Sequence, residues 1–237
     1  MSVSAPSRRL KSRLIAALCV VVLGLIGLGY RSTRESPPNW PWEQSRVDDH
    51  DDGTLTVVNE RPAVPGYDRS CEAGHGCVFG PAWTDDVNAP DGGNGCDQRS
   101  DTMRKSLEQV QLKPGTNGCI VASGVLHDPY TGQTVTYQRT GNTEVVADHV
   151  IPLAAAWDLG AAQWTLQKRQ NFANDPRNLI ITTRGANLAK GDKTPGEWMP
   201  QLSQCRYAQT YLEVARLYGV AITRADQRAL TTATQSC

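Results

Sequence analysis

The chain of 237 residues has room for one medium-sized domain and an N-terminal extension. Its formal net charge is zero, which excludes a protein that binds nucleic acid through a large overall positive charge. The charge is unevenly distributed: residues 1–31 hold five basic and no acidic residues, residues 32–95 hold 12 acidic and 4 basic residues, and residues 96–237 hold 12 acidic and 15 basic residues. Only the last part is basic, and only mildly.

The N-terminus has the pattern of an export signal. Four cations between residues 8 and 13 precede an uncharged run of 17 residues, 14–30. A basic region before an apolar run orients the chain so that the part after the run lies outside the membrane. The length of the run falls between that of a signal-peptide core and that of a short transmembrane helix. Because no A-x-A cleavage site follows, we expect an uncleaved anchor, with a cleaved signal peptide as the alternative.

Composition divides the chain into four segments. Residues 1–31 form the signal peptide or signal anchor, and residues 32–60 form an acidic, proline-containing tether with little apolar periodicity. Residues 61–95, here called the lead-in segment, are rich in Pro, Gly and Asp and predict an irregular, disulfide-tied structure. From residue 96 to residue 237 the apolar residues recur with the periods of helices and strands, which predicts the folded domain.

Six cysteines follow the apolar run, and an even number in an exported chain predicts disulfides. Six cysteines allow 15 pairings. We expect pairing in sequence order, because Cys205 opens one predicted helix and Cys237 ends the next, and these ends meet in an antiparallel helix pair. A zinc site is the alternative, but the chain has no C-x-x-C motif. The expected disulfides are Cys71–Cys77, Cys96–Cys119 and Cys205–Cys237.

Helical and strand patterns are mixed along the folded domain, which predicts an α+β fold. The expected elements begin with a helix over 101–110 and with strands over 118–126 and 134–138 around a turn at 128–132. A strand over 145–151 follows, then a helical stretch through Trp157 and Trp164 that Gly160 weakens, a turn at 174–176 and a strand over 178–182. The last elements are a helix capped by Thr183 and ended by Gly191, and helices over 203–218 and 224–236.

Four polar residues follow the order strand, strand, helix in the middle of this domain. Asp148 and His149 end one predicted strand, Asn178 opens the next, and Asn187 lies on the helix after it. A histidine can take a proton from water near neutral pH, and carboxylate and amide oxygens suit a hard cation such as Mg²⁺. Because adjacent strand residues point to opposite faces, a twist or bulge near Pro152 is needed to bring Asp148 and His149 to one site.

The same region resembles the core of HNH endonucleases. The resemblance rests on ADHVIPLAAAWDLGAAQW at 147–164, on Asn178-Leu179 and on NLAKGD at 187–192. More narrowly, GCDQR at 95–99 and DPYTG at 128–132 resemble the C-terminal family of GmrSD-type restriction enzymes, in its exported, cysteine-bearing bacterial branch. The similarity extends over roughly residues 95–237.

This resemblance implies a ββα-metal (HNH, or His-Me finger) core with surrounding helices. It implies that His149 is the general base, that Asp148 and Asn187 hold one divalent cation, and that Asn178 braces the loop that carries the base. Because the last position is asparagine instead of histidine, Mg²⁺ or Mn²⁺ is expected in preference to Zn²⁺. Such a metal can supply the counter-charge that the mildly basic domain lacks.

Three further cations are candidates for contacts to substrate phosphates: Arg99, Arg169 and Lys190. Arginine suits bidentate phosphate binding, and Lys190 follows Asn187 by three residues on a similar helix face. His50, His75 and His127 lie outside the pattern and are expected to face solvent or to be structural.

The sequence therefore predicts an exported metal-dependent endonuclease that hydrolyses DNA, with RNA as an open alternative. It would be secreted, or anchored to the bacterial membrane through residues 14–30, and no protein partner is evident. A catalytically silent cell-surface binding module with the same fold is the competing hypothesis. A peptidase is disfavoured because neither G-x-S-x-G nor H-E-x-x-H occurs in the chain.

Overall fold

The computed structural model describes residues 55–141 and 144–237, which belong to one structural unit, Trp40–Cys237. The predicted export segment and most of the predicted tether lie outside these residues. Across the described ranges, no helix combines the length and the apolar character that crossing a membrane requires.

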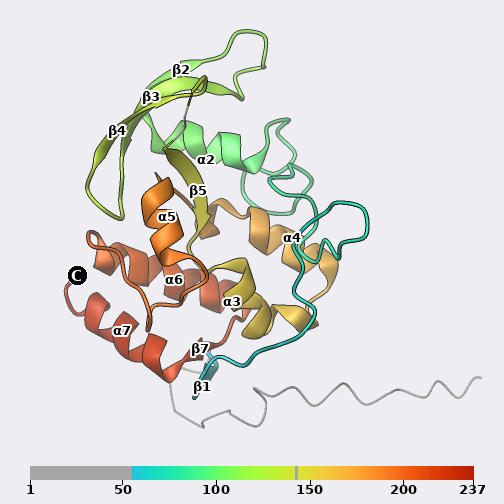
Figure 1. The fold of residues 1–237 in the computed structure, drawn as a ribbon, viewed down its shortest axis with the longest axis vertical. Helices are drawn as coiled ribbons and strands as arrows, with labels where there is room; N and C mark the ends of the chain where they lie inside the picture. Colours follow the sequence, from blue (N-terminus) through green and yellow to red (C-terminus); the bar gives the residue numbers. More distant parts are fainter. Residues whose placement is uncertain (1–54, 142–143) are drawn as a thin grey trace, which may run out of the picture. The chain divides into compact units, whose positions relative to one another are not determined.

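The described strands form three small sheets (Figure 1). In one sheet β1 pairs in parallel with β7; in another β2, β3 and β4 form an antiparallel meander; in the last β5 pairs with β6 in antiparallel fashion. The strands are β1 (Val57–Val58), β2 (Glu108–Leu112), β3 (Val121–His127), β4 (Thr134–Gln138), β5 (Val145–His149), β6 (Leu179–Thr183) and β7 (Ile222–Thr223).

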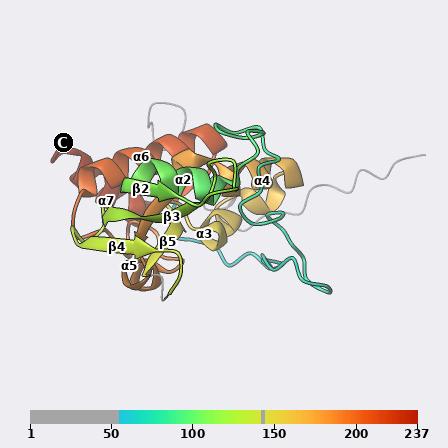
Figure 2. The same cartoon turned by 90° about the horizontal axis from the view of Figure 1, so that it is seen from above.

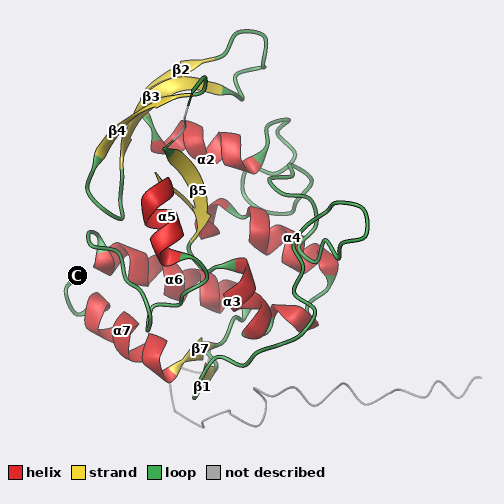
Figure 3. Cartoon of the chain, viewed as in Figure 1, coloured by secondary structure: helices red, strands yellow, loops and turns green. Residues whose placement is uncertain are grey.

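Helices surround these sheets, and the two C-terminal helices pack against each other in the lower half of the view (Figures 1 and 3). The described helices are α2 (Gln98–Ser106), α3 (Leu153–Asp158), α4 (Leu166–Asn174), α5 (Arg184–Lys190), α6 (Gln204–Tyr218) and α7 (Arg224–Thr234), with short 3₁₀ turns at Ala161–Gln163 and Pro176–Asn178. Turned by 90°, the molecule shows α6 and α2 lying on the same side of β5 (Figure 2). The described residues contain both helices and strands in separate segments, which confirms the α+β prediction.

The β5–β6 pair carries helices on both faces. Its register runs without interruption from Val145 opposite Thr183 to His149 opposite Leu179. Side chains therefore alternate between the faces. Val145 and Ile181 pack with Met103 of α2 on one face, whereas the other face meets α5.

Helix termini follow the signals that the sequence carries. The Thr183 side chain accepts a hydrogen bond from the backbone N–H of Ala186 and begins α5, and Gly191 ends that helix with a φ of +56°. Thr223 and Asp226 form a reciprocal capping box at the start of α7. Gly219 ends α6 in the left-handed region. These caps and helix ends were all predicted.

Two predicted helical elements differ from the structure, α4 was not predicted, and the strands expected over 118–126 and 145–151 are Val121–His127 and Val145–His149. The helix expected over 101–110 begins instead at Gln98, because the Asp97 side chain caps it by accepting from the N–H of Ser100. It ends at Ser106, and residues 108–112 pair with β3, so the last part of that prediction was wrong. The helical stretch after β5 is broken at Gly160, whose φ of +129° ends α3.

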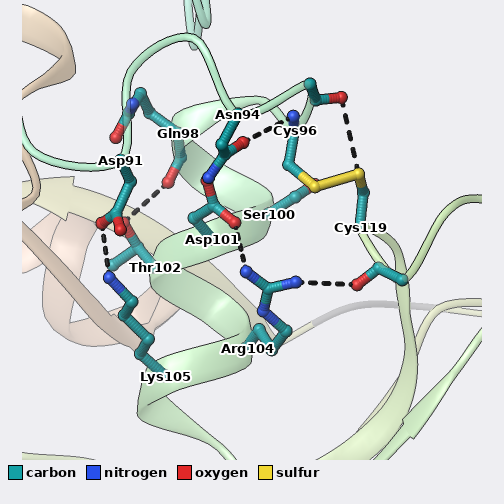
Figure 4. A network of polar contacts seen from close by, with 12 residues as sticks. Asp91, Asn94, Cys96, Gln98, Ser100, Asp101, Thr102, Arg104, Lys105 and Cys119 are labelled. Carbon is teal, nitrogen blue, oxygen red and sulfur yellow. Dashed lines mark hydrogen bonds and ion pairs between the residues drawn. A yellow bond between two sulfur atoms is a disulfide. The ribbon is translucent and has the colours of Figure 1, made fainter.

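Three disulfides join Cys71 to Cys77, Cys96 to Cys119, and Cys205 to Cys237, which are the expected pairs. The second bond lies in a polar network at the start of α2 (Figure 4). There Asp101 accepts hydrogen bonds from Asn94 at 2.8 Å and from Arg104 at 2.7 Å, while Asn94 also accepts from the N–H of Cys96. The end of the lead-in segment is thus fixed to α2.

Candidate active site

His149 ends β5, and its ring is held by the chain at the end of α4. The residue is 9% exposed, and its Nε2 lies 2.8 Å from the carbonyl oxygen of Ala173. A carbonyl oxygen can only accept, so Nε2 carries the proton. In the neutral ring this tautomer leaves the lone pair on Nδ1, which is the atom that can accept a proton.

Trp83 of the lead-in segment stacks on this imidazole. The two ring centroids are 5.5 Å apart, and the ring planes differ by only 9°. Trp83 has a φ of +60°, in the left-handed region that a bulky residue adopts only when its surroundings enforce it. Its carbonyl oxygen accepts from the N–H of Gln98 at 3.2 Å, so α2 fixes the loop that places the indole.

A small pocket of about 20 Å³ lies beside His149, and Arg69, Trp83 and Asn174 also line it. A pocket of this size has room for about one water molecule. Burial lowers the pKa of His149 to about 4, and the nearby positive charges of Arg69 and Lys190 act in the same direction. The imidazole is therefore neutral at neutral pH, and its Nδ1 carries no proton.

Asp148 has a different environment from its neighbour. The residue is 6% exposed, and its carboxylate accepts from the hydroxyl of Tyr130 at 2.8 Å. The ammonium of Lys190 lies 3.0 Å from Oδ2 and 3.2 Å from Oδ1, and it also donates to the carbonyl oxygen of His149 at 2.7 Å. Burial raises the pKa of Asp148 although Lys190 opposes the shift, and burial lowers the pKa of Lys190.

Asp148 and His149 thus point to opposite sides of β5. The polar partners of Asp148 are Lys190 of α5 and Tyr130, whereas His149 contacts Ala173 of α4 and Trp83. Asp148 does not line the pocket at His149. The expectation that a twist or bulge brings both side chains to one site was wrong, because the ladder of β5 and β6 stays regular up to His149.

Asn178 binds the segment that directly follows the histidine. Its side-chain oxygen accepts from the N–H of Ile151 at 2.9 Å, and its backbone carbonyl accepts from the N–H of Val150 at 2.8 Å. Its amide nitrogen lies 3.4 Å from the carbonyl oxygen of Phe172. Asn178 is fully buried, so these bonds brace the turn between His149 and α3.

The two expected metal ligands lie on β5 and α5, and one of them, Asp148, is already paired with a cation of the protein itself. Asn187 lies on α5 one turn before Lys190 and is half-buried, and Asp148 offers an oxygen of the right type. Both carboxylate oxygens, however, already face the Lys190 ammonium. Within the described ranges, no cluster of three His, Cys, Asp or Glu residues could hold a metal ion.

The three candidate phosphate contacts have unequal surroundings. Lys190 is fully buried, so it does not reach a substrate in this structure. The guanidinium of Arg169 donates to the backbone carbonyls of Val78, Ala161 and Trp164, which gives it a bracing position between α4 and the lead-in segment. Arg99 lies half-buried on α2.

The two described histidines outside the pattern, His75 and His127, are exposed, as expected. His75 faces Asp68 at 3.0 Å, and His127 faces Thr134 at 3.0 Å. His50 lies outside the described residues.

Sequence reasoning missed four residues of this region: Arg69, Trp83, Tyr130 and Asn174. Tyr130 belongs to the DPYTG motif at 128–132, so that motif was a usable signal. Asp128 of the same motif is buried and accepts from Thr182 and Thr183 of β6, which fixes the turn against the β5–β6 pair. The residues of the lead-in segment had no periodic pattern that could have assigned them to a site.

Comparison with known proteins places the chain in a family. Residues 97–233 match the family model of the C-terminal domain of GmrSD restriction endonucleases, and the chain belongs to that family. A protein of Arthroderma benhamiae, described as an uncharacterized secreted protein, is 38% identical over 146 residues, which cover 60% of this chain and 68% of the relative. No solved structure matches the chain. Arg69 and Trp83 precede the matched residues and nevertheless lie at His149.

Proposed function

We propose that the protein is an exported nuclease that hydrolyses phosphodiester bonds of DNA, with RNA as a second substrate class, and that His149 is its general base. Membership of a family described by restriction endonucleases supports nucleic acid as the substrate. The observation that carries the proposal is the bond from His149 Nε2 to the Ala173 carbonyl, beside a pocket with room for one water. This bond leaves Nδ1 as the proton acceptor.

The reaction follows from these groups. His149 Nδ1 takes a proton from water as the water oxygen attacks phosphorus, and the bond from phosphorus to the leaving ester oxygen breaks. The leaving oxygen then takes a proton from solvent. A phosphate anion at the pocket raises the proton affinity of His149 and so makes the imidazole a stronger base in the complex. Arg69 lines the pocket and offers the planar donor pair that suits phosphate oxygens.

Metal dependence is a separate part of the proposal. Asp148 and Asn187 would hold the Mg²⁺ or Mn²⁺ ion, which would supply positive charge against the developing charge on the phosphate. Binding there requires the Lys190 ammonium to give up Asp148, because two cations do not share one buried carboxylate without repulsion. Activity that stops with EDTA and returns with Mg²⁺ supports the metal; activity that is unchanged in EDTA contradicts it.

The proposed place of action is outside the cell. Three disulfides and a relative described as secreted support an extracellular protein. Anchoring through residues 14–30 is tested by fractionation: an anchored protein stays with membranes in high salt, whereas a protein with a cleaved signal peptide is recovered in the soluble fraction.

The competing function is a silent binding module, and the closed Asp148–Lys190 pair is the observation that favours it. Incubation of the purified full-length protein with plasmid DNA and with RNA distinguishes the two functions. A nuclease shortens one or both substrates, and a silent module binds them without cleavage.

A further inference from the structure

Asn174, the last residue of α4, has a buried oxygen without a partner. The side chain is only 1% exposed, and its Nδ2 donates to the carbonyl oxygen of Gln170 at 2.9 Å. Its Oδ1 is one of two buried side-chain polar atoms in the described part of the chain that find no hydrogen-bond partner, and the hydroxyl of Tyr211 is the other. A buried acceptor without a partner costs free energy and requires an explanation.

The orientation of this amide follows from its neighbour. A carbonyl oxygen can pair only with a donor, so the amide nitrogen must face Gln170. The oxygen is then the atom left for another partner. Asn174 and His149 both line the pocket of about 20 Å³, which has room for about one water. Ala173, the preceding residue, holds the His149 ring, so one short stretch of backbone places both side chains.

We propose that Asn174 is a positioning residue that orients the attacking water. One O–H of the water donates to Asn174 Oδ1 and the other donates to Nδ1 of His149, so the oxygen lone pair is directed toward phosphorus. The proton on the histidine side passes to His149 during attack, and the other proton stays on the new phosphate oxygen. This inference rests on the proposed nuclease function. The proposal explains why Asn174 Oδ1 is buried beside His149 without a hydrogen-bond partner in the protein.

Two substitutions in the full-length protein separate orientation from structure. Asn174→Ala removes both the acceptor and the bond to Gln170, whereas Asn174→Asp removes that bond and keeps an acceptor oxygen. If Asn174 orients water, Asn174→Ala lowers kcat by about 10–100-fold with KM changed by less than about threefold, since misplacing a reacting atom has effects of this order. Asn174→Asp then keeps a kcat at least about tenfold above that of Asn174→Ala.

A purely structural role gives a different result. It lowers kcat equally in both variants, because both lose the bond to Gln170, and that outcome overturns the proposal, as does an unchanged kcat in Asn174→Ala. Tyr211→Phe is the matched control, because it removes the other unpaired buried atom, and it leaves kcat unchanged. His149→Ala, measured in parallel, separates the two proposals: if it retains the wild-type rate, the proposed function fails, and if it alone loses activity, only the role of Asn174 fails.

A second test uses the wild-type structure instead of activity, so it does not depend on whether the variants fold. A high-resolution crystal structure of the full-length wild-type protein shows, if the proposal holds, an ordered water within hydrogen-bond distance of Asn174 Oδ1 and His149 Nδ1. A dry pocket, or a protein group on Asn174 Oδ1, overturns it.

Discussion

Replacing Asp148 with alanine leaves the Lys190 ammonium buried without its counter-charge. Lys190 is fully buried, and its remaining partner is the neutral carbonyl of His149. Breaking a buried ion pair by removing one partner costs about 3–5 kcal/mol. Because burial already lowers the pKa of Lys190, the lysine can release its proton in the variant, which places the loss toward the lower end of that range.

Thermal and urea unfolding of the full-length protein measure this loss. For a chain of this size, about 3–5 kcal/mol corresponds to a decrease in Tm of roughly 6–20 °C. The double variant Asp148→Leu with Lys190→Met replaces the pair by apolar groups and is expected to recover most of the lost stability. The matched control is Asp192→Ala, since Asp192 is 65% exposed in its ion pair with Arg61, and it costs less than about 1 kcal/mol. A loss below about 1 kcal/mol for Asp148→Ala refutes the buried pair.

Two further predictions concern stability. The pKa of His149 is about 4 in the folded protein and about 6.5 in the unfolded chain, so on acidification the unfolded chain binds a proton first. Lowering the pH from 6.5 to 4 therefore decreases the free energy of unfolding by about 3 kcal/mol. Urea unfolding across this range checks it, and a His149→Phe variant that shows the same decline argues against the assignment. The Cys205–Cys237 bond closes a sequence separation of 32 residues, so Cys205→Ser with Cys237→Ser lowers the free energy of unfolding by about 3–4 kcal/mol. An unchanged urea midpoint is inconsistent with a closed disulfide at this place.

Local rules predicted the helix ends and the disulfides well. Caps depend on a few neighbouring atoms, so Thr183, Gly219 and the Thr223–Asp226 box could be identified from sequence alone. The helix expected over 101–110 failed in its last turn, because pairing with β3 determines the conformation of residues 108–112. A propensity argument does not contain such tertiary contacts.

The candidate site was predicted only in part. Asp148 and His149 lie on β5 and Asn187 lies on α5, as expected, whereas Asn178 ends the 3₁₀ turn directly before β6 instead of opening that strand. The sequence did not show that Lys190 would be buried on Asp148, since that contact depends on how closely α5 packs against β5.

The sequence also did not predict that the lead-in segment contributes to the surroundings of His149. Trp83 reaches His149 through an irregular loop that is bonded to Gln98 of α2 and to Gln170 of α4, and irregular segments of this kind carry no periodic pattern. The surroundings of the histidine therefore became visible only in three dimensions.

The central claim is that His149 is the base of a nuclease, and the cleavage rate of the His149→Ala variant tests it most directly. The full-length variant is compared with wild type and with His127→Ala, which removes an exposed histidine of β3. We predict that His149→Ala retains its fold by circular dichroism and loses about 10²–10⁴-fold in kcat, the usual contribution of a positioned base, and that added Mg²⁺ does not restore it. His127→Ala is expected to cleave at the wild-type rate. Cleavage by His149→Ala at a rate close to wild type would contradict the account.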